Sequence, residues 1–197
     1  MQSARPSPSF EPTSTPAQET TRSSAPLTTN QEELLSDGGD DAFRALVHDL
    51  LAFSARIREI RDVLGSLVGL KGPAYTALIS IAHLQRHGEV TVTSVSQHLN
   101  VSQPFATAEI GKLVAEGLVD KARSTVDRRS VSLTVTDRGH DLLAGLAPEQ
   151  RVVNDTLFAS LDRKSFESLA AIMPALVADA DHTLKMAAAS DAETGVA

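Results

Sequence analysis

The basic residues between Lys121 and Arg138 are the clearest chemical feature of this sequence. Five basic side chains, at positions 121, 123, 128, 129 and 138, stand there against two acidic ones, in a chain of 197 residues with a formal net charge of -7. Positive charge concentrated in an acidic chain is suited to binding anions, phosphate above all. The ordinary alternative is a solvated surface in which Asp127 pairs with Arg129 and holds a loop.

The residues on either side of the tip at 127–129 alternate as paired strands do. The apolar side chains at 131, 133 and 135 share one face, and residues 118–123 can supply the partner strand. We therefore expect a β-hairpin with one buried face and a cationic tip.

Two short helices are expected before this hairpin. The first covers residues 93–99, with Thr93 as N-cap, and Asn100 tolerates the left-handed conformation that ends a helix. Ser102 caps the second, and Pro104 lies in its first turn, where a missing N–H costs nothing. The buried stripe of the second helix is Ala106, Ile110 and Leu113. Two helices joined by a short turn and followed by a hairpin predict a winged helix-turn-helix, whose second helix enters the major groove of DNA.

Long helices are expected on both sides of this domain. One starts near Asp41 and carries an apolar stripe for more than twenty residues, while Thr136 caps another and a third contains Pro174. Their apolar faces exceed what one small winged domain can cover, so a partner subunit is expected. The fold class is thus mainly α (α+β), a winged helix-turn-helix with N- and C-terminal helices that form a dimerisation domain.

Composition suggests the domain boundaries. The N-terminal segment is rich in Ser, Thr and Pro, and it has too few large apolar side chains to offset chain entropy, so it is expected to be disordered; a partner-binding arm is the alternative. The expected organisation is a tail at 1–38, a dimerisation helix at 39–70, a winged helix-turn-helix at 71–138, C-terminal dimerisation helices at 139–186 and a loose tail at 187–197.

Over about residues 41–186 the chain resembles the MarR (multiple-antibiotic-resistance regulator) family. The resemblance is carried by Val101-Ser-Gln-Pro, Glu116-Gly-Leu-Val119, the Asp127-Arg-Arg129 tip and Leu133-Thr-Val-Thr-Asp-Arg-Gly139, in that order and spacing. Such proteins are homodimers, and most repress transcription until a small ligand loosens them. The resemblance therefore implies a homodimer that binds a pseudo-palindromic double-stranded DNA operator and a small-molecule effector.

The resemblance also implies roles for individual residues. The family inserts an arginine of the wing tip into the minor groove; we favour Arg129 over Arg128, with Asp127 orienting the loop. Ser102 and Gln103 would meet phosphate or base edges, and Gln103 could pair with adenine. The expected DNA-binding residues are Ser102, Gln103, Pro104, Thr107, Ala108, Lys112, Lys121, Arg123, Asp127, Arg128 and Arg129.

The outward face of the second helix departs from the family pattern. It is small and nearly uncharged, and the arginine common at the position of Ala108 is missing. We favour a helix that sits deep and touches thymine methyl groups, with Thr107 and Gln103 reading bases. The alternative is weak DNA binding, in a winged-helix module that docks protein instead. The residues of this face are Pro104, Thr107, Ala108, Gly111 and Ala115.

Ligands of the family, often aromatic carboxylates, bind between the dimer helices and the winged domain. His48, Tyr75 and His83 are the candidates for such an effector site, against ordinary structural roles. His83 and His87 lie four residues apart, with Glu89 near, a spacing that can hold a transition metal. A second pair of ligands would be needed and the other histidines cannot be placed, so no metal and no cofactor is expected.

Several classes of protein are disfavoured by what the sequence lacks. It contains no cysteine, which removes disulfides, thiolate metal sites and thiol-based sensing. It has no phosphate-cradling glycine loop, nucleophile elbow or His-Glu-x-x-His, so an enzyme is not expected. There is neither a secretory signal pattern nor an apolar run of about 18 residues. We therefore expect a cytoplasmic, nucleoid-associated protein.

Overall fold

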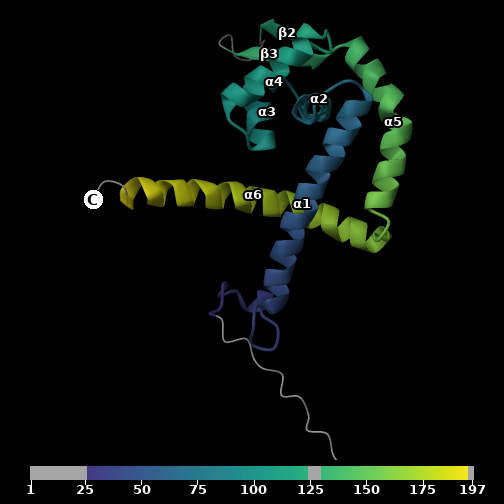
Figure 1. Cartoon of the computed structure of the whole chain (residues 1–197). Helices are drawn as coiled ribbons and strands as arrows, with labels where there is room; N and C mark the ends of the chain where they lie inside the picture. Colours follow the sequence, from purple (N-terminus) through teal and green to yellow (C-terminus); the bar gives the residue numbers. More distant parts are fainter. Residues whose placement is uncertain (1–25, 124–129, 195–197) are drawn as a thin grey trace, which may run out of the picture. The chain divides into compact units, whose positions relative to one another are not determined.

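The computed structural model describes residues 26–123 and 130–194. The chain divides into two compact units, residues 1–56 and 57–197, and the boundary falls inside helix α1 (Asp41–Leu67; Figure 1). Among the described residues, no single helix is long and apolar enough to cross a membrane. Helices α1 and α2 (Gly72–Leu84), which meet at a bend of 92°, satisfy that test of length and composition only when they are taken together.

The first unit contains an ordered segment before α1. A 3-10 turn covers Glu32–Leu34, and Ser36 pairs with Gly39 in an isolated bridge. The prediction of a disordered tail through residue 38 is therefore wrong for residues 26–38, which are ordered. Residues 1–25 of that tail lie outside the described residues.

Asp40 holds this segment, which we call the Asp40 clasp (residues 26–44). The Asp40 side chain is 4% exposed, and its Oδ2 atom accepts hydrogen bonds from the Thr28 backbone N–H at 2.6 Å and hydroxyl at 2.5 Å. Its Oδ1 atom accepts from Arg44 Nε at 2.8 Å, and Arg44 also donates to the carbonyl of Pro26. The Arg44 hydrogen bond, followed by those from Thr28, holds the pKa of Asp40 well below its usual value.

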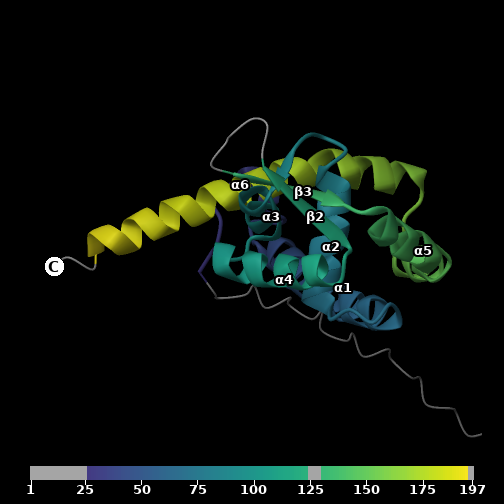
Figure 2. The ribbon, with the colours of Figure 1, turned by 90° about the horizontal axis from the view of Figure 1, so that it is seen from above.

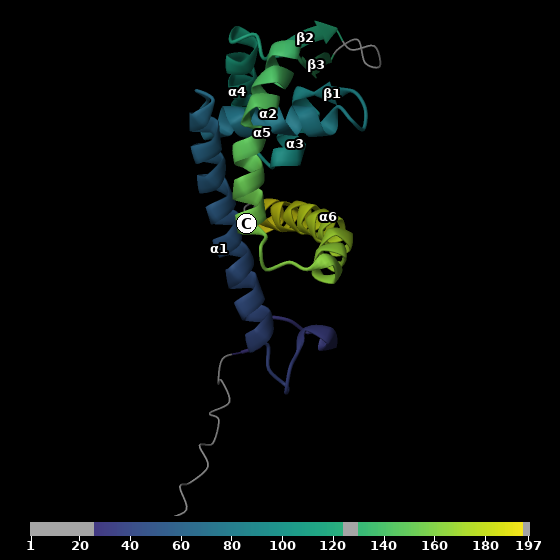
Figure 3. The same ribbon diagram turned by 90° about the vertical axis from the view of Figure 1, so that its right-hand side faces the viewer.

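The second unit contains a winged helix-turn-helix. Its three strands form an antiparallel sheet in the order β1-β3-β2, with Val119 of β2 opposite Val135 of β3. Figure 2 and Figure 3 show the strands beside α2, α3 and α4, and α5 leading away from them. This arrangement confirms the predicted fold. After α2, the elements of the domain are β1 (Val90–Thr91), α3 (Val92–Leu99), α4 (Gln103–Ala115), β2 (Val119–Arg123) and β3 (Val131–Val135).

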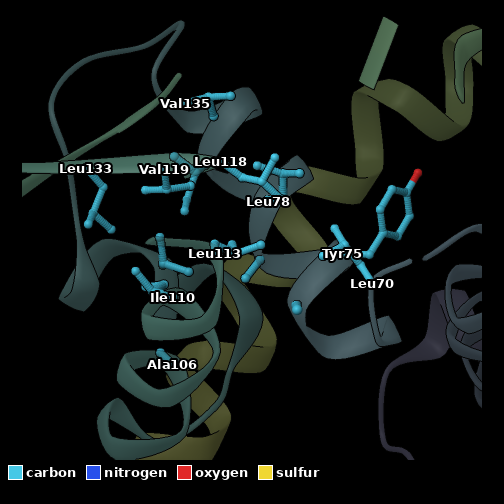
Figure 4. Close-up of a cluster of buried hydrophobic side chains, with 14 of the residues drawn as sticks. Leu70, Tyr75, Leu78, Ala106, Ile110, Leu113, Leu118, Val119, Leu133 and Val135 are labelled. Atoms are coloured by element: carbon cyan, nitrogen blue, oxygen red, sulfur yellow. The ribbon is translucent and has the colours of Figure 1, made fainter. Parts of the chain in front are cut away.

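One apolar core joins the hairpin to the helices. Ile110 and Leu113 of α4 are fully buried with Leu78 of α2 and with Leu133 and Val135 of β3 (Figure 4). The buried stripe predicted for α4 is thus confirmed. The buried face predicted for the hairpin is only partly confirmed, because the Val131 side chain, which pairs with Arg123 at the end nearest the tip, is 42% exposed.

Hydroxyl groups define where α3 and α4 begin. The prediction of Thr93 as N-cap of α3 is wrong, because Thr91 takes that position. The Thr91 hydroxyl accepts from the N–H of Ser94 at 3.1 Å, while the Ser94 hydroxyl accepts from the N–H of Thr91 at 2.9 Å. Asn100 ends α3 with φ 49°, and Ser102 caps α4, both as predicted.

Two long helices, α5 (Asp137–Leu157) and α6 (Arg163–Thr194), complete the second unit. Thr136 caps α5 as predicted, since its hydroxyl accepts from the N–H of Gly139 at 3.0 Å. Helix α6 runs on to Thr194, through much of the expected loose tail at 187–197. The run Ala187-Ala188-Ala189 explains this difference, because alanine favours helix and residues 187–194 contain no glycine or proline.

Candidate nucleic-acid interface

Helix α4 presents an open face next to the hairpin. Its N-cap, Ser102, is exposed, and the Ser102 Oγ atom accepts from the N–H of Phe105 at 3.4 Å. Pro104 has no N–H, and the Ala106 N–H donates to the carbonyl of Ser102 at 3.0 Å. The Gln103 N–H is therefore the group of the first turn that can meet an anion, and the helix dipole favours one there. The exposed side chains at this end and along the face are Gln103, Pro104, Phe105, Thr107, Ala108 and Ala115.

The polar side chains expected to read DNA from α4 have partners within the subunit. Gln103 Nε2 donates to the Thr93 hydroxyl of α3 at 3.0 Å. Lys112 Nζ donates to Glu109 Oε1 at 2.5 Å, although Lys112 itself is half exposed. To read a base, Gln103 must therefore break its hydrogen bond to Thr93 and form one to the base instead.

Glu109 is a buried acid that sequence reasoning did not identify. Its side chain is 9% exposed, and its Oε2 atom has no hydrogen-bond partner among the described residues. Because Lys112 reaches Oε1, the pair fixes the Lys112 ammonium group beside α4. A buried position at Glu109 could have been inferred from its spacing, three residues after Ala106 and four before Leu113.

Two of the predicted phosphate contacts lie on β2. Lys121 pairs with Leu133 in the hairpin and Arg123 with Val131, and both basic side chains are exposed. The cationic tip itself, with Asp127, Arg128 and Arg129, falls outside the described residues. The hairpin stem thus carries two of the expected cations next to α4.

The three residues predicted to bind an effector occupy different environments. Tyr75 is 0% exposed, its hydroxyl has no hydrogen-bond partner among the described residues, and burial raises its pKa. Figure 4 shows that this hydroxyl points away from the core cluster. His83 is exposed on the same helix, about 12 Å further along the axis. His48 is exposed on α1, in the first unit.

Three histidines, His83, His87 and His98, cluster around the end of α2. The rings of His83 and His87 lie 5.3 Å apart in an edge contact, and those of His83 and His98 of α3 stack at 5.8 Å. Desolvation, with help from the charges of His83 and Arg61, lowers the pKa of His98. In the described parts of the chain, no three His, Cys, Asp or Glu side chains are arranged to hold a metal ion.

Known proteins resemble the chain over this same region. The MarR family model matches residues 68–130. The uncharacterized HTH-type transcriptional regulator YwhA of Bacillus subtilis is 24% identical over 93 residues, which cover 47% of this chain and 67% of YwhA. The HTH-type transcriptional repressor MdtR of the same organism is 25% identical over 99 residues, or 48% of this chain and 64% of MdtR. The chain thus spans about two thirds of the length of these relatives.

Solved structures agree in fold. A MarR protein from Peptoclostridium difficile superimposes with a TM-score of 0.58 at 17% identity, and the alignment covers 82% of this chain and 97% of that one. The fold is thus that of a known architecture, and together with the match to the family model it confirms the resemblance drawn from the sequence motifs. Over residues 68–130 the chain is thus similar to the MarR family, and its fold is that of a solved MarR protein.

Proposed function

We propose that the protein is a DNA-binding transcriptional regulator, most simply a repressor, that binds a pseudo-palindromic operator as a homodimer. The observation that carries this proposal is the exposed face of α4, whose N-terminus is capped by Ser102 and which packs beside β2, the strand that carries the exposed Lys121 and Arg123. Helix N-termini and basic side chains are the groups that bind DNA phosphates. The names of YwhA and MdtR, a transcriptional regulator and a repressor, support the same function.

The apolar surfaces of α1 and α6 support a homodimer. Both helices keep large apolar side chains exposed in the single chain, and a soluble subunit gains free energy by covering such a surface. A two-fold axis would place the two α4 helices in successive major grooves, about 34–36 Å apart. The exposed apolar residues of α6 are Phe166, Leu169, Ile172, Met173, Leu176, Val177, Leu184 and Met186.

Within this proposal the DNA contacts remain those expected from the sequence. Ser102 and the first turn of α4 meet phosphate, Thr107 and Ala108 face the base edges, and Lys121 and Arg123 contact the backbone. Arg129 enters the minor groove. The effector, a small molecule such as an aromatic acid, releases the protein from DNA. Tyr75, whose buried hydroxyl has no hydrogen-bond partner within residues 26–123 and 130–194, is the best supported of the three effector candidates.

One observation favours a second function. Because Gln103 and Lys112 have partners within the subunit, α4 offers few free hydrogen-bonding groups to bases. A winged-helix module that docks protein would have such a face. Binding to DNA would then be weak or absent.

A mobility-shift assay with the DNA flanking the protein's own gene, at about 50 mM and 200 mM salt, tests the proposal. We expect a retarded band that fades at the higher salt, because binding releases counterions from the phosphates. Arg129→Ala should weaken binding more than about tenfold without altering dimerisation. Arg151→Ala, which removes an equal charge from the exposed side of α5, is the control. Absence of a band at either salt concentration would favour the protein-docking module.

A further inference from the structure

Phe105 is a large apolar side chain at the solvent-exposed start of α4. It is 44% exposed, and its N–H donates to the N-cap Ser102. At 100° per residue it lies about a quarter turn from the centre of the buried stripe, on the side of Ala108. A single exposed phenyl ring is ordinary on a protein surface, so its position is what matters.

That position is the end of α4 that would enter the groove first. Side chains of a helix lean toward its N-terminus, so the phenyl ring covers the turn at Ser102 rather than the middle of the helix. In helix-turn-helix proteins the N-terminal residues of the second helix contact base edges. Phe105 is therefore placed to reach bases before the residues further along α4.

The polar side chains near Phe105 already have partners within the subunit, so apolar contact is the main way in which this end of α4 can read bases. Gln103 is bonded to Thr93, and Lys112 is paired with Glu109. Beside Phe105, Ala108 has only a methyl group, and a Cβ added at Gly111 would meet no atom within 4 Å. A small surface from which one ring protrudes can approach the groove floor closely.

We propose that Phe105 reads thymine in the operator by packing its ring against the C5-methyl group. Thymine is the base that presents a methyl group in the major groove, and phenylalanine is among the side chains that contact it. The inference rests on the proposed DNA-binding function and names the base that is read.

The test uses deoxyuridine, which lacks the methyl group but keeps the hydrogen-bonding pattern of thymine. A binding site is first selected from a random duplex pool with the full-length protein. Each thymine of that site is then replaced in turn, and Kd is measured by fluorescence anisotropy. We expect at least one replacement per half-site to weaken binding about fourfold, the equivalent of one buried methyl group.

Phe105→Ala should bind the thymine site more weakly and should lose this fourfold difference at the same position. Phe105→Leu should keep part of it, because leucine still offers apolar contact. Val131→Ala is the matched control, since Val131 is 42% exposed but lies on β3; it should leave the thymine-to-deoxyuridine ratio unchanged. An unchanged thermal midpoint would show that Phe105→Ala is folded.

The outcomes separate this inference from the function on which it rests. If the wild type binds the selected duplex but shows no deoxyuridine effect, or if Phe105→Ala keeps the effect, Phe105 does not read thymine while DNA binding stands. If the selection enriches no duplex, both the proposed function and this inference fail, and protein docking becomes the better explanation of the exposed ring.

Discussion

Gly139 shows how a single residue fixes the join between the hairpin and α5. A Cβ atom there would lie 2.4 Å from the carbonyl oxygen of Leu118 and 2.7 Å from Cγ1 of Val135. Gly139→Ala should therefore reduce the free energy of unfolding by about 1–3 kcal/mol, as overpacking does in other cores. Chemical denaturation measures the change.

Gly145→Ala is the matched control in the same helix. A Cβ at Gly145 meets no atom within 4 Å, and alanine is the better helix former. This variant should raise the stability by about 0.5–1 kcal/mol. Equal effects of the two substitutions would mean that the close approach at Gly139 does not exist in solution.

Most capping residues could be predicted from the sequence, although the N-cap of α3 is Thr91 and not Thr93 as predicted. Ser102, Asn100 and Thr136 act through their own backbone neighbours, so their chemistry and position were sufficient. The hydrogen bond of Gln103 could not be predicted in this way, because its partner Thr93 lies ten residues away on another helix. Phe105 was overlooked, because an apolar residue beside a buried stripe is usually assigned to the core.

At the scale of elements, the Asp40 clasp makes a pH-dependent contribution to stability. The folded pKa of Asp40 lies below the ordinary value of 3.8, so its ionised form stabilises the folded chain. That contribution is fully present above the unfolded pKa and is lost progressively as the pH falls below it. Asp40→Asn should therefore lower the thermal midpoint at pH 6, and the difference from wild type should shrink toward pH 3.

Asp41→Asn provides the comparison for the clasp. Asp41 is the neighbouring carboxylate, exposed at the first residue of α1, so its substitution controls for the loss of one negative charge at this helix start. A constant gap between wild type and Asp40→Asn from pH 6 to pH 3 would contradict the assignment. Hydrogen exchange of the Thr28 N–H, which donates to Asp40, reports the same contact directly.

Elements with strong periodicity were predictable, whereas the clasp was not. The long stripe that starts at Asp41 and the alternation at 131–135 gave α1 and β3 nearly at their observed bounds. Residues 26–38 have neither pattern, and their order comes from hydrogen bonds to Asp40 across twelve residues. The amino-acid composition of a segment indicates its average tendency to be ordered or disordered, so it cannot reveal one specific hydrogen bond such as that from Thr28 to Asp40.

At the scale of the whole molecule, the homodimer remains a prediction that the exposed face of α6 allows to be tested. Leu176 lies on that face and is 44% exposed, and Ala171 lies near the opposite side of the helix. Leu176→Glu should convert the dimer to a monomer at micromolar concentration, because it places a charge where apolar surfaces must meet. Light scattering coupled to size-exclusion chromatography measures the mass.

Ala171→Glu adds the same charge away from the apolar face, so the measured mass of this variant should remain that of a dimer. The monomer made by Leu176→Glu should keep its winged helix-turn-helix, since α6 supplies none of the buried residues of that core. Its operator affinity should nevertheless fall more than tenfold, because binding to the second half-site becomes a separate bimolecular event. A monomeric variant with full operator affinity would show that each subunit binds DNA alone, and the pseudo-palindromic operator would lose its physical basis.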